Sequence, residues 1–182
     1  MEEVSHHLLG MRGKMFRPTL TLLSSELEGR AEPRALRLAA VIELMHLATL
    51  VHDDSVDHSA TRRGLPTVNS MFSHQVSVIM GDFLYSRALR ALVAIRDFDV
   101  VRVVTDVSSE LSMGEMRQLA AIDALHFGEP EYELLIRAKT ASLISAACES
   151  GALCGAARFR AANATRSGRM RLSSASTARC RC

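Results

Sequence analysis

The feature that most constrains this chain is a nearly continuous apolar run, LRLAAVIELMHLATLV, at residues 36–51. A helix that is apolar on most sides has to be buried on most sides. The polar residues Glu43, His46 and Thr49 recur every three positions, so they lie along one stripe of the helix, and Asp53 continues that stripe. We therefore expect a buried helix whose polar stripe faces a cavity or a partner.

The rest of the chain also shows helical patterns. The apolar helix is expected to begin near Pro33, because proline is tolerated in the first helical turn. Further helices are predicted at residues 18–27, at 68–95 with a break near Gly81, at 100–125, and from Glu129 to residue 157. Alternating strand patterns are absent, and the hydrophobic content of 48% is enough for a sizeable core. The sequence predicts an all-α fold of long helices with short connections.

Residues 158–182 differ in composition from the helical part at residues 1–157. They contain seven arginines, no acidic residue and no apolar periodicity. We expect this Arg/Ser-rich tail to be disordered, or to be the frameshifted end of a longer gene. Without the tail, 15 basic residues stand against 20 acidic ones. The body of the chain is therefore mildly acidic, and nucleic-acid binding is not expected.

Targeting and membrane signals are not found in the sequence. There is no signal-peptide pattern, and no apolar run approaches the roughly 18–20 residues needed to span a bilayer. The four cysteines do not have the spacing of a zinc site. We expect a cytoplasmic protein without a membrane span.

Asp53, Asp54 and Asp57 form the pattern D-D-x-x-D at the end of the apolar helix. Positions three and four apart share a helix face, so these carboxylates can converge. The helix C-terminus carries partial negative charge, which disfavours acids there unless a cation binds. Mg2+ combines one or two carboxylates with waters and phosphate oxygens. Acids facing water at a helix end are the alternative, but their place at the end of a buried helix favours a metal.

Three basic groups accompany the acidic pattern. Arg62 and Arg63 follow it in a loop closed by glycine, and Lys14 and Arg17 precede it in RGKMFRP. Lys139 interrupts an apolar helix in RAKTAS. Each basic residue alone is more often a solvated or snorkelling side chain. Together with a magnesium site they predict a pocket for a polyanion with several phosphate oxygens.

In this order the motifs resemble one family. RGKMFRP, ELMHLATLVHDDSVDHSATRRGLPTVN, GDFLYSRAL, GEMRQL and RAKTASLISAACESGA are similar to the motifs of trans-polyprenyl diphosphate synthases, over about residues 10–157. The resemblance implies an isoprenoid synthase-like antiparallel bundle of long helices around a central apolar cavity, here incomplete at the C-terminus. It also implies Mg2+-dependent head-to-tail transfer, in which isopentenyl diphosphate is added to an allylic prenyl diphosphate.

The resemblance assigns a role to each residue that matches a motif. Isopentenyl diphosphate would be held by Lys14, Arg17, His46 and Arg63. Mg2+ would be held by Asp53, Asp54 and Asp57, and the allylic diphosphate by Arg62, Lys139 and Thr140. The catalytic set would be the three aspartates with Lys139. His46 alone would be interpreted as a core histidine, but it lies about 10 Å before Asp53 on the same helical face. Glu115 and Gln118 share a helix face and are expected to help line the pocket.

The side chains just before the first aspartate determine product length in the resembled family. Here they are Ala48 and Thr49, which are small and would leave the cavity open. The resemblance therefore implies a medium or long all-trans polyprenyl diphosphate, with a quinone side chain as its expected fate. Homodimers are usual in this family, so a homo-oligomer is expected.

The sequence departs from the family pattern in one respect, since it contains no second D-D-x-x-D. With half of the metal site, we expect this chain to have little or no turnover alone. The alternatives are a truncated inactive chain and a non-catalytic subunit of a heteromeric prenyl synthase. A terpene cyclase is a further alternative, but it would not need the residues assigned to isopentenyl diphosphate.

Overall fold

The computed structural model describes residues 2–10, 13–27, 33–123 and 128–164. The prediction of an all-α fold of long helices is confirmed. The elements in chain order are α1 (Glu2–Gly10), α2 (Phe16–Leu27), α3 (Pro33–Val56), β1 (Thr61–Arg62), β2 (Leu65–Pro66), α4 (Val68–Met71), α5 (His74–Val93), α6 (Phe98–Asp123), α7 (Glu129–Ile136), the π-helical turn η1 (Arg137–Ala141) and α8 (Ser142–Ala164).

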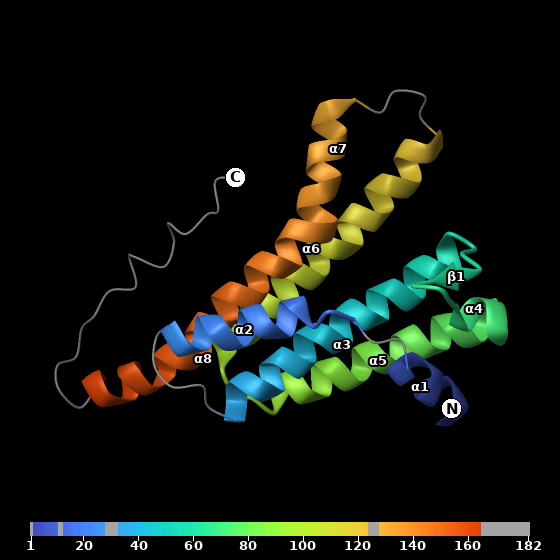
Figure 1. Ribbon diagram of the computed structural model, residues 1–182. Helices are drawn as coiled ribbons and strands as arrows, with labels where there is room; N and C mark the ends of the chain where they lie inside the picture. Colours follow the sequence, from blue (N-terminus) through green and yellow to red (C-terminus); the bar gives the residue numbers. More distant parts are fainter. Residues whose placement is uncertain (1, 11–12, 28–32, 124–127, 165–182) are drawn as a thin grey trace.

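The apolar helix α3 lies at the centre of the bundle (Figure 1). It packs against α5, which returns antiparallel to it, and against α2 and α8. Its side chains Leu38, Val41, Ile42 and Met45 are buried, together with valines of α6 and the first turns of α8. A smaller second cluster joins the other end of α3 to α1, α4 and α5; it comprises Val4, Leu8, Val51, Val68 and Met80.

Helix α3 corrects the expectation that the chain contains no apolar run long enough to span a bilayer. Among the described residues it is the one helix long and apolar enough to cross a bilayer, with a mean hydropathy of 1.4 over an 18-residue window. A core helix of a globular protein passes the same test. The burial of α3 against α2, α5 and α8 gives its apolar residues partners within the bundle.

The helix break predicted near Gly81 was wrong. The chain breaks earlier, at Phe72 and Ser73, where the Ser73 hydroxyl caps α5 by accepting a hydrogen bond from the Val76 amide at 3.2 Å. Serine is a strong N-cap, and this signal places the start of α5. At Gly81 the helix is continuous. The glycine has a packing role there, since it makes room for the ring of His52, whose Nε2 would lie 2.3 Å from an added Cβ.

Three local features differ from the predicted helix pattern. Strands β1 and β2 form a two-residue hairpin that the sequence analysis missed, with Arg62 opposite Leu65. The helix predicted from Glu129 onward contains the π-turn η1, which the periodicity did not show. Helix α8 continues to Ala164, past the expected end at residue 157. Residues 165–182, and with them most of the expected tail, lie outside the described part of the chain.

Candidate functional site

The acidic end of α3 lies beside Lys139 of the π-turn η1. Lys139 Nζ lies 3.7 Å from Asp53 Oδ2 and 2.9 Å from Glu115 Oε1, and it donates a hydrogen bond of 2.7 Å to Gln118 Oε1. Burial, together with the negative charge of Glu115, raises the pKa of Asp53 to about 6, although Lys139 opposes the shift. The structure thus brings the two expected pocket residues of α6 into contact with Lys139.

The π-turn η1 places Lys139 at this position. π-Helical turns inside α-helices often occur at functional sites, because they displace one residue from the regular helical face. The neighbouring helix allows close approach at Gly114, where an added Cβ would lie 2.8 Å from Ala138 Cβ and 3.3 Å from Lys139 Cγ. The glycine of GEMRQL therefore has a packing role, which lets α6 and η1 meet beneath Lys139.

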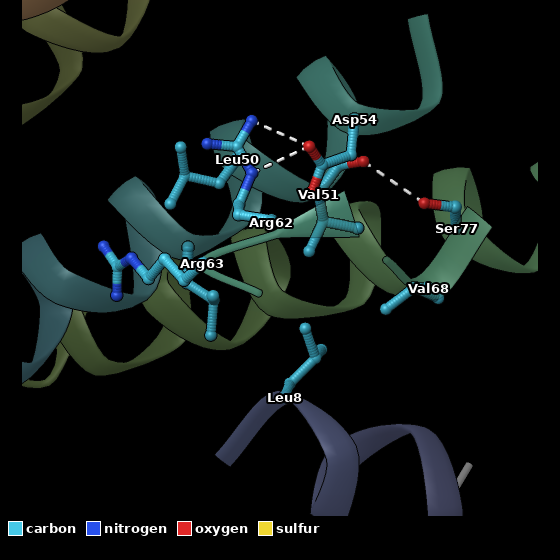
Figure 2. A pocket seen from close by; sticks show the side chains of 9 residues that line it. Leu8, Leu50, Val51, Asp54, Arg62, Arg63, Val68 and Ser77 are labelled. Atoms are coloured by element: carbon cyan, nitrogen blue, oxygen red, sulfur yellow. Dashed lines mark hydrogen bonds and ion pairs between the residues drawn. The ribbon is translucent and has the colours of Figure 1, made fainter. Parts of the chain in front are cut away.

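Asp54 pairs with Arg62 (Figure 2), whereas Asp53 lies near Lys139. Both Nε and Nη2 of Arg62 lie 2.7 Å from Asp54 Oδ1. Asp54 is only 4% exposed, and burial raises the pKa of its carboxyl while the bonds from Arg62 act against that rise. In this structure the charge of Asp54 is therefore neutralised within the chain.

The arginine hairpin, β1 and β2 with the turn between them, presents Arg62 and Arg63 on a tight turn. The turn residues Arg63 and Gly64 both have positive φ, at 52° and 79°. Two-residue hairpin turns of this kind need positive φ at both central positions, and glycine meets that need without strain. A non-glycine residue in this region is strained, and such strain concentrates at functional sites.

Arg63 lies against Gly13 and near Arg17 of α2 and His46 of α3, and we call this set of four neighbouring residues the basic pocket. The Arg63 guanidinium lies against Gly13, where an added Cβ would be 2.7 Å from its Nη1. Burial, with the nearby charges of Arg17, Arg63 and Arg62, lowers the pKa of His46 to about 4. Burial also lowers the pKa of Arg17, Glu43 opposes that shift, and Arg63 adds to it.

One nitrogen of the basic pocket has no partner within the described chain. Arg17 Nε is buried and donates no hydrogen bond there. A buried donor without a partner costs free energy, so its persistence in a structure calls for an explanation such as a missing ligand. The charge on Arg17 and Arg63 and the unused donor both favour an anion with several oxygen acceptors.

A groove of about 310 Å³ runs along α3 from the acidic end into the bundle. Its inner part is lined by Met45, Ala48, Tyr85 and Leu111, and its mouth by His52, Asp53, Asp82 and Glu115. The polar stripe of α3 therefore does face a cavity at Thr49 and Asp53, as the sequence predicts. Ala48 is buried and lies at the position that the prediction of product length concerns.

The donor set at the acidic end fits a magnesium ion. Asp53 is a partly buried carboxylate whose charged form is destabilised by Glu115 and Asp57, and a divalent cation would relieve that repulsion. Within the described residues, no three His, Cys, Asp or Glu side chains are grouped closely enough to form a metal site by themselves. The predicted three-carboxylate cluster is therefore not preformed, because Asp54 pairs with Arg62. One or two carboxylates with waters and phosphate oxygens is the usual environment of Mg2+.

The structure brings together most of the predicted site residues but not all. Arg17, His46 and Arg63 gather on one side, and Asp53 and Lys139 on the other. Asp57, Lys14 and Thr140 are exposed at the margins. The sequence pattern did not identify His52, Asp82 and Tyr85 as groove residues. His52 Nε2 lies 3.3 Å from Asp82 Oδ1, and the spacing of GDFLYSRAL on a helix was the available signal for the last two.

Comparison with known proteins gives a consistent result. The family model described as polyprenyl synthetase matches residues 1–172. The chain is 37% identical over 155 residues to a short chain isoprenyl diphosphate synthase of Methanothermobacter thermautotrophicus, covering 83% of this chain and 48% of that protein. It is 34% identical over 156 residues to the octaprenyl diphosphate synthase of Escherichia coli, covering 85% of this chain and 48% of the relative.

A solved structure shows the same fold. The polyprenyl synthase of Caulobacter crescentus, crystallised as a complex with calcium and isoprenyl diphosphate, superposes with a TM-score of 0.81 at 34% identity. The match covers 85% of this chain and 47% of that structure. The predicted isoprenoid synthase-like bundle, incomplete at the C-terminus, is therefore confirmed, and the chain spans about half the length of the relatives it matches.

Proposed function

The chain belongs to the polyprenyl synthetase family, and we propose that it binds diphosphates for head-to-tail prenyl transfer. In this proposal isopentenyl diphosphate is added to an allylic prenyl diphosphate. The observation that carries the proposal is the basic pocket, where burial and nearby positive charge lower the pKa of His46 to about 4. In the same pocket Arg17 Nε is buried without a partner. A diphosphate supplies both the negative charge and the acceptors that this pocket lacks.

We assign the two diphosphates to the two sides of the site. Arg17, Arg63 and His46, with Lys14 at the margin, hold isopentenyl diphosphate. Lys139, Thr140 and Arg62 hold the allylic diphosphate. Lys139 Nζ is positioned by Gln118 and Glu115, so it can donate to a leaving oxygen without reorganising. A fixed cation aimed at developing negative charge lowers the barrier for departure of the diphosphate.

The acidic end and the groove have complementary roles in this proposal. Asp53 and Asp57, with Asp54 once released from Arg62, would hold Mg2+, which when bound supplies positive charge to the allylic diphosphate. Met45, Ala48 and Leu111 line the groove with apolar side chains that exclude water from the allylic cation. The proposed Mg2+ dependence is supported by the donor set at Asp53 and by the calcium complex of the Caulobacter relative.

Calorimetric titration of the full chain with isopentenyl diphosphate tests the proposal. We expect saturable binding that Arg17→Ala weakens at least about tenfold, because hydrogen bonds to charged groups contribute about 1.5–3 kcal/mol. Arg102→Ala is the matched control, since Arg102 is an exposed arginine of α6 paired with Asp106. An unchanged affinity in Arg17→Ala, or no binding by the unmodified chain, would contradict the proposal.

A chain-elongation assay with Mg2+ separates the enzyme from the alternative of a non-catalytic chain. Product formed from isopentenyl and allylic diphosphates by the purified chain supports the enzyme and contradicts our expectation of little turnover. Binding of both diphosphates without product supports a non-catalytic chain or subunit. This assay is needed to decide between an enzyme and a non-catalytic chain, because the chain spans about half the length of its relatives.

We further propose a medium or long all-trans product, used for a quinone side chain. The support is Ala48, whose small side chain lines the groove beside Met45 and Leu111. Ala48→Phe should weaken binding of geranylgeranyl diphosphate more than binding of geranyl diphosphate, because the added ring blocks the inner groove. Equal effects on the two ligands would contradict the assignment. The relatives include a short-chain and an octaprenyl synthase, so family membership alone leaves product length open. A homo-oligomer and a cytoplasmic location stay predictions.

A further inference from the structure

Helix α1 makes a direct bond to the arginine hairpin. His7 Nε2 lies 2.8 Å from the carbonyl oxygen of Pro66, the last residue of β2. A carbonyl oxygen can only accept a hydrogen bond, so Nε2 carries the proton and donates it. The bond joins residues far apart in sequence, and its acceptor lies in the strand that pairs with the strand of Arg62.

The next residue of α1 packs beneath the same hairpin. Leu8 is 5% exposed and belongs to the cluster that contains Val51, Val68 and Met80. It points from α1 into a small pocket of about 20 Å³, which Arg62 and Arg63 also line (Figure 2). Leu8 therefore fills the apolar side of the pocket, while His7 fixes the strand that follows the turn.

The position of α1 in the sequence connects its contacts with the arginine hairpin to the rest of the basic pocket. Helix α1 ends at Gly10, shortly before Gly13, which lies against the guanidinium of Arg63. Anchoring α1 on the hairpin therefore holds Gly10 close in sequence to the stretch of Gly13, Lys14 and Arg17 that lies beside Arg63.

We propose that α1 positions the arginine hairpin for diphosphate binding, with His7 as a positioning residue and Leu8 as its apolar support. The inference rests on the proposed function of the basic pocket for its ligand, but the anchoring itself does not. The hairpin needs such an anchor because it has only two residues in each strand and a strained turn at Arg63. An isolated two-stranded hairpin is marginal at best in water.

Amide hydrogen exchange at residues 61–67 of the full chain tests the anchoring directly. We expect His7→Ala to accelerate exchange there about fivefold, the effect of losing one hydrogen bond of ordinary strength. His7→Gln keeps an N–H donor and should restore protection. His6→Ala is the matched control, because His6 is exposed on the same helix. Equal exchange in the His7→Ala and His6→Ala proteins would overturn the inference.

Titration with isopentenyl diphosphate then tests whether anchoring serves the ligand. His7→Ala should weaken its binding several-fold, and His7→Gln should restore it, while the melting temperature changes little in either. If exchange accelerates but affinity is unchanged, the positioning role is overturned. If the unmodified chain does not bind the ligand, the proposed function fails, and the exchange data decide the anchoring independently. Leu8→Ala gives a second variant, expected to accelerate exchange in the same residues.

Discussion

The acidic end of α3 and the basic pocket carry opposite charges and are built in different ways. Lys139 contacts Asp53 and Glu115 where the long helices meet, so part of the negative charge there is compensated within the chain. The basic pocket is assembled from a short hairpin, the start of α2 with the residues before it, and His46 of α3, which is partly buried beside the arginines. The proposed isopentenyl diphosphate site is therefore marked by positive charge that the fold leaves only partly balanced, whereas the proposed allylic diphosphate site uses cations that are already paired within the chain.

The ion pair between Arg62 and Asp54 links these two regions, and breaking it is expected to have the largest effect. Arg62→Met leaves the buried Asp54 carboxylate without its two bonds, which costs about 3 kcal/mol of unfolding free energy. Urea unfolding at neutral pH measures the change. Asp54→Asn combined with Arg62→Met should recover most of the loss, since an amide is less costly to bury than an unpaired charge. A stability unchanged by the single substitution would show that the hairpin is not tied to α3 through this pair.

Gly114→Ala tests the packing beneath the acidic end. The added Cβ meets Ala138 Cβ, a rigid neighbour, so α6 and η1 have to separate. Overpacking of this kind costs about 1–3 kcal/mol. We expect a fall of about 2 kcal/mol in the free energy of unfolding, together with weaker binding of the allylic diphosphate as Lys139 moves. Gly10→Ala is the control, because nothing lies within 4 Å of its added Cβ. Equal stability of the two variants would contradict the close approach.

The pH dependence of stability tests the burial of His46 and the positive charge around it in the basic pocket. The pKa of His46 is about 4 in the folded chain, below its ordinary value of 6.5, so the unfolded chain binds more protons between these values. The stabilising contribution is complete above about pH 6.5 and is lost as the pH falls toward 4. With allowance for solvent screening we expect about 1 kcal/mol. Urea unfolding of the ligand-free chain and of His46→Gln should show this loss only in the former. Parallel pH profiles would mean that His46 does not titrate as the pocket geometry implies.

Of these substitutions, Gly13→Ala should have the smallest effect on stability, and it should weaken the binding of only one of the two diphosphates. Its added Cβ meets the far end of the Arg63 side chain, which can swing away, whereas Gly114 faces rigid atoms. We expect a change in unfolding free energy within about 0.5 kcal/mol. The displaced guanidinium should weaken isopentenyl diphosphate binding, measured by calorimetry, and leave binding of the allylic diphosphate unchanged. A loss of stability as large as in Gly114→Ala would remove the distinction between the two regions.

The sequence predicted the helical architecture well because helix formation follows local periodicity. The apolar run of α3 and the stripe of Glu43, His46 and Thr49 placed a buried helix beside a cavity, and the groove confirms the stripe at Thr49. The π-turn at Lys139 and the hairpin at Arg63 were missed. Both are short departures from regular geometry that depend on neighbouring segments, so periodicity over a longer window does not show them.

The sequence predicted which residues form the candidate site better than it predicted which of them pair with one another. The close spacing of Asp53, Asp54 and Asp57 in the sequence favoured one shared metal ion. In the structure, however, Asp54 forms an ion pair with Arg62, and Asp53 forms one with Lys139. Which carboxylate meets which cation depends on the rotation of α3 about its axis and on burial at its end. The contact of His7 with Pro66 had no sequence signal, because α1 reaches the hairpin only in the folded chain.

By itself the sequence determined that the chain is all-α, that acids end a buried helix, and that its motifs belong with those of prenyl diphosphate synthases. These properties follow from residue order and helical period, which act over a few turns of chain. Only the tertiary structure decided that Lys139 stands against Asp53, that Arg63 lies on Gly13, and that α1 anchors the hairpin. Those contacts join distant segments, and their strength depends on desolvation and charge that exist only once the helices have packed.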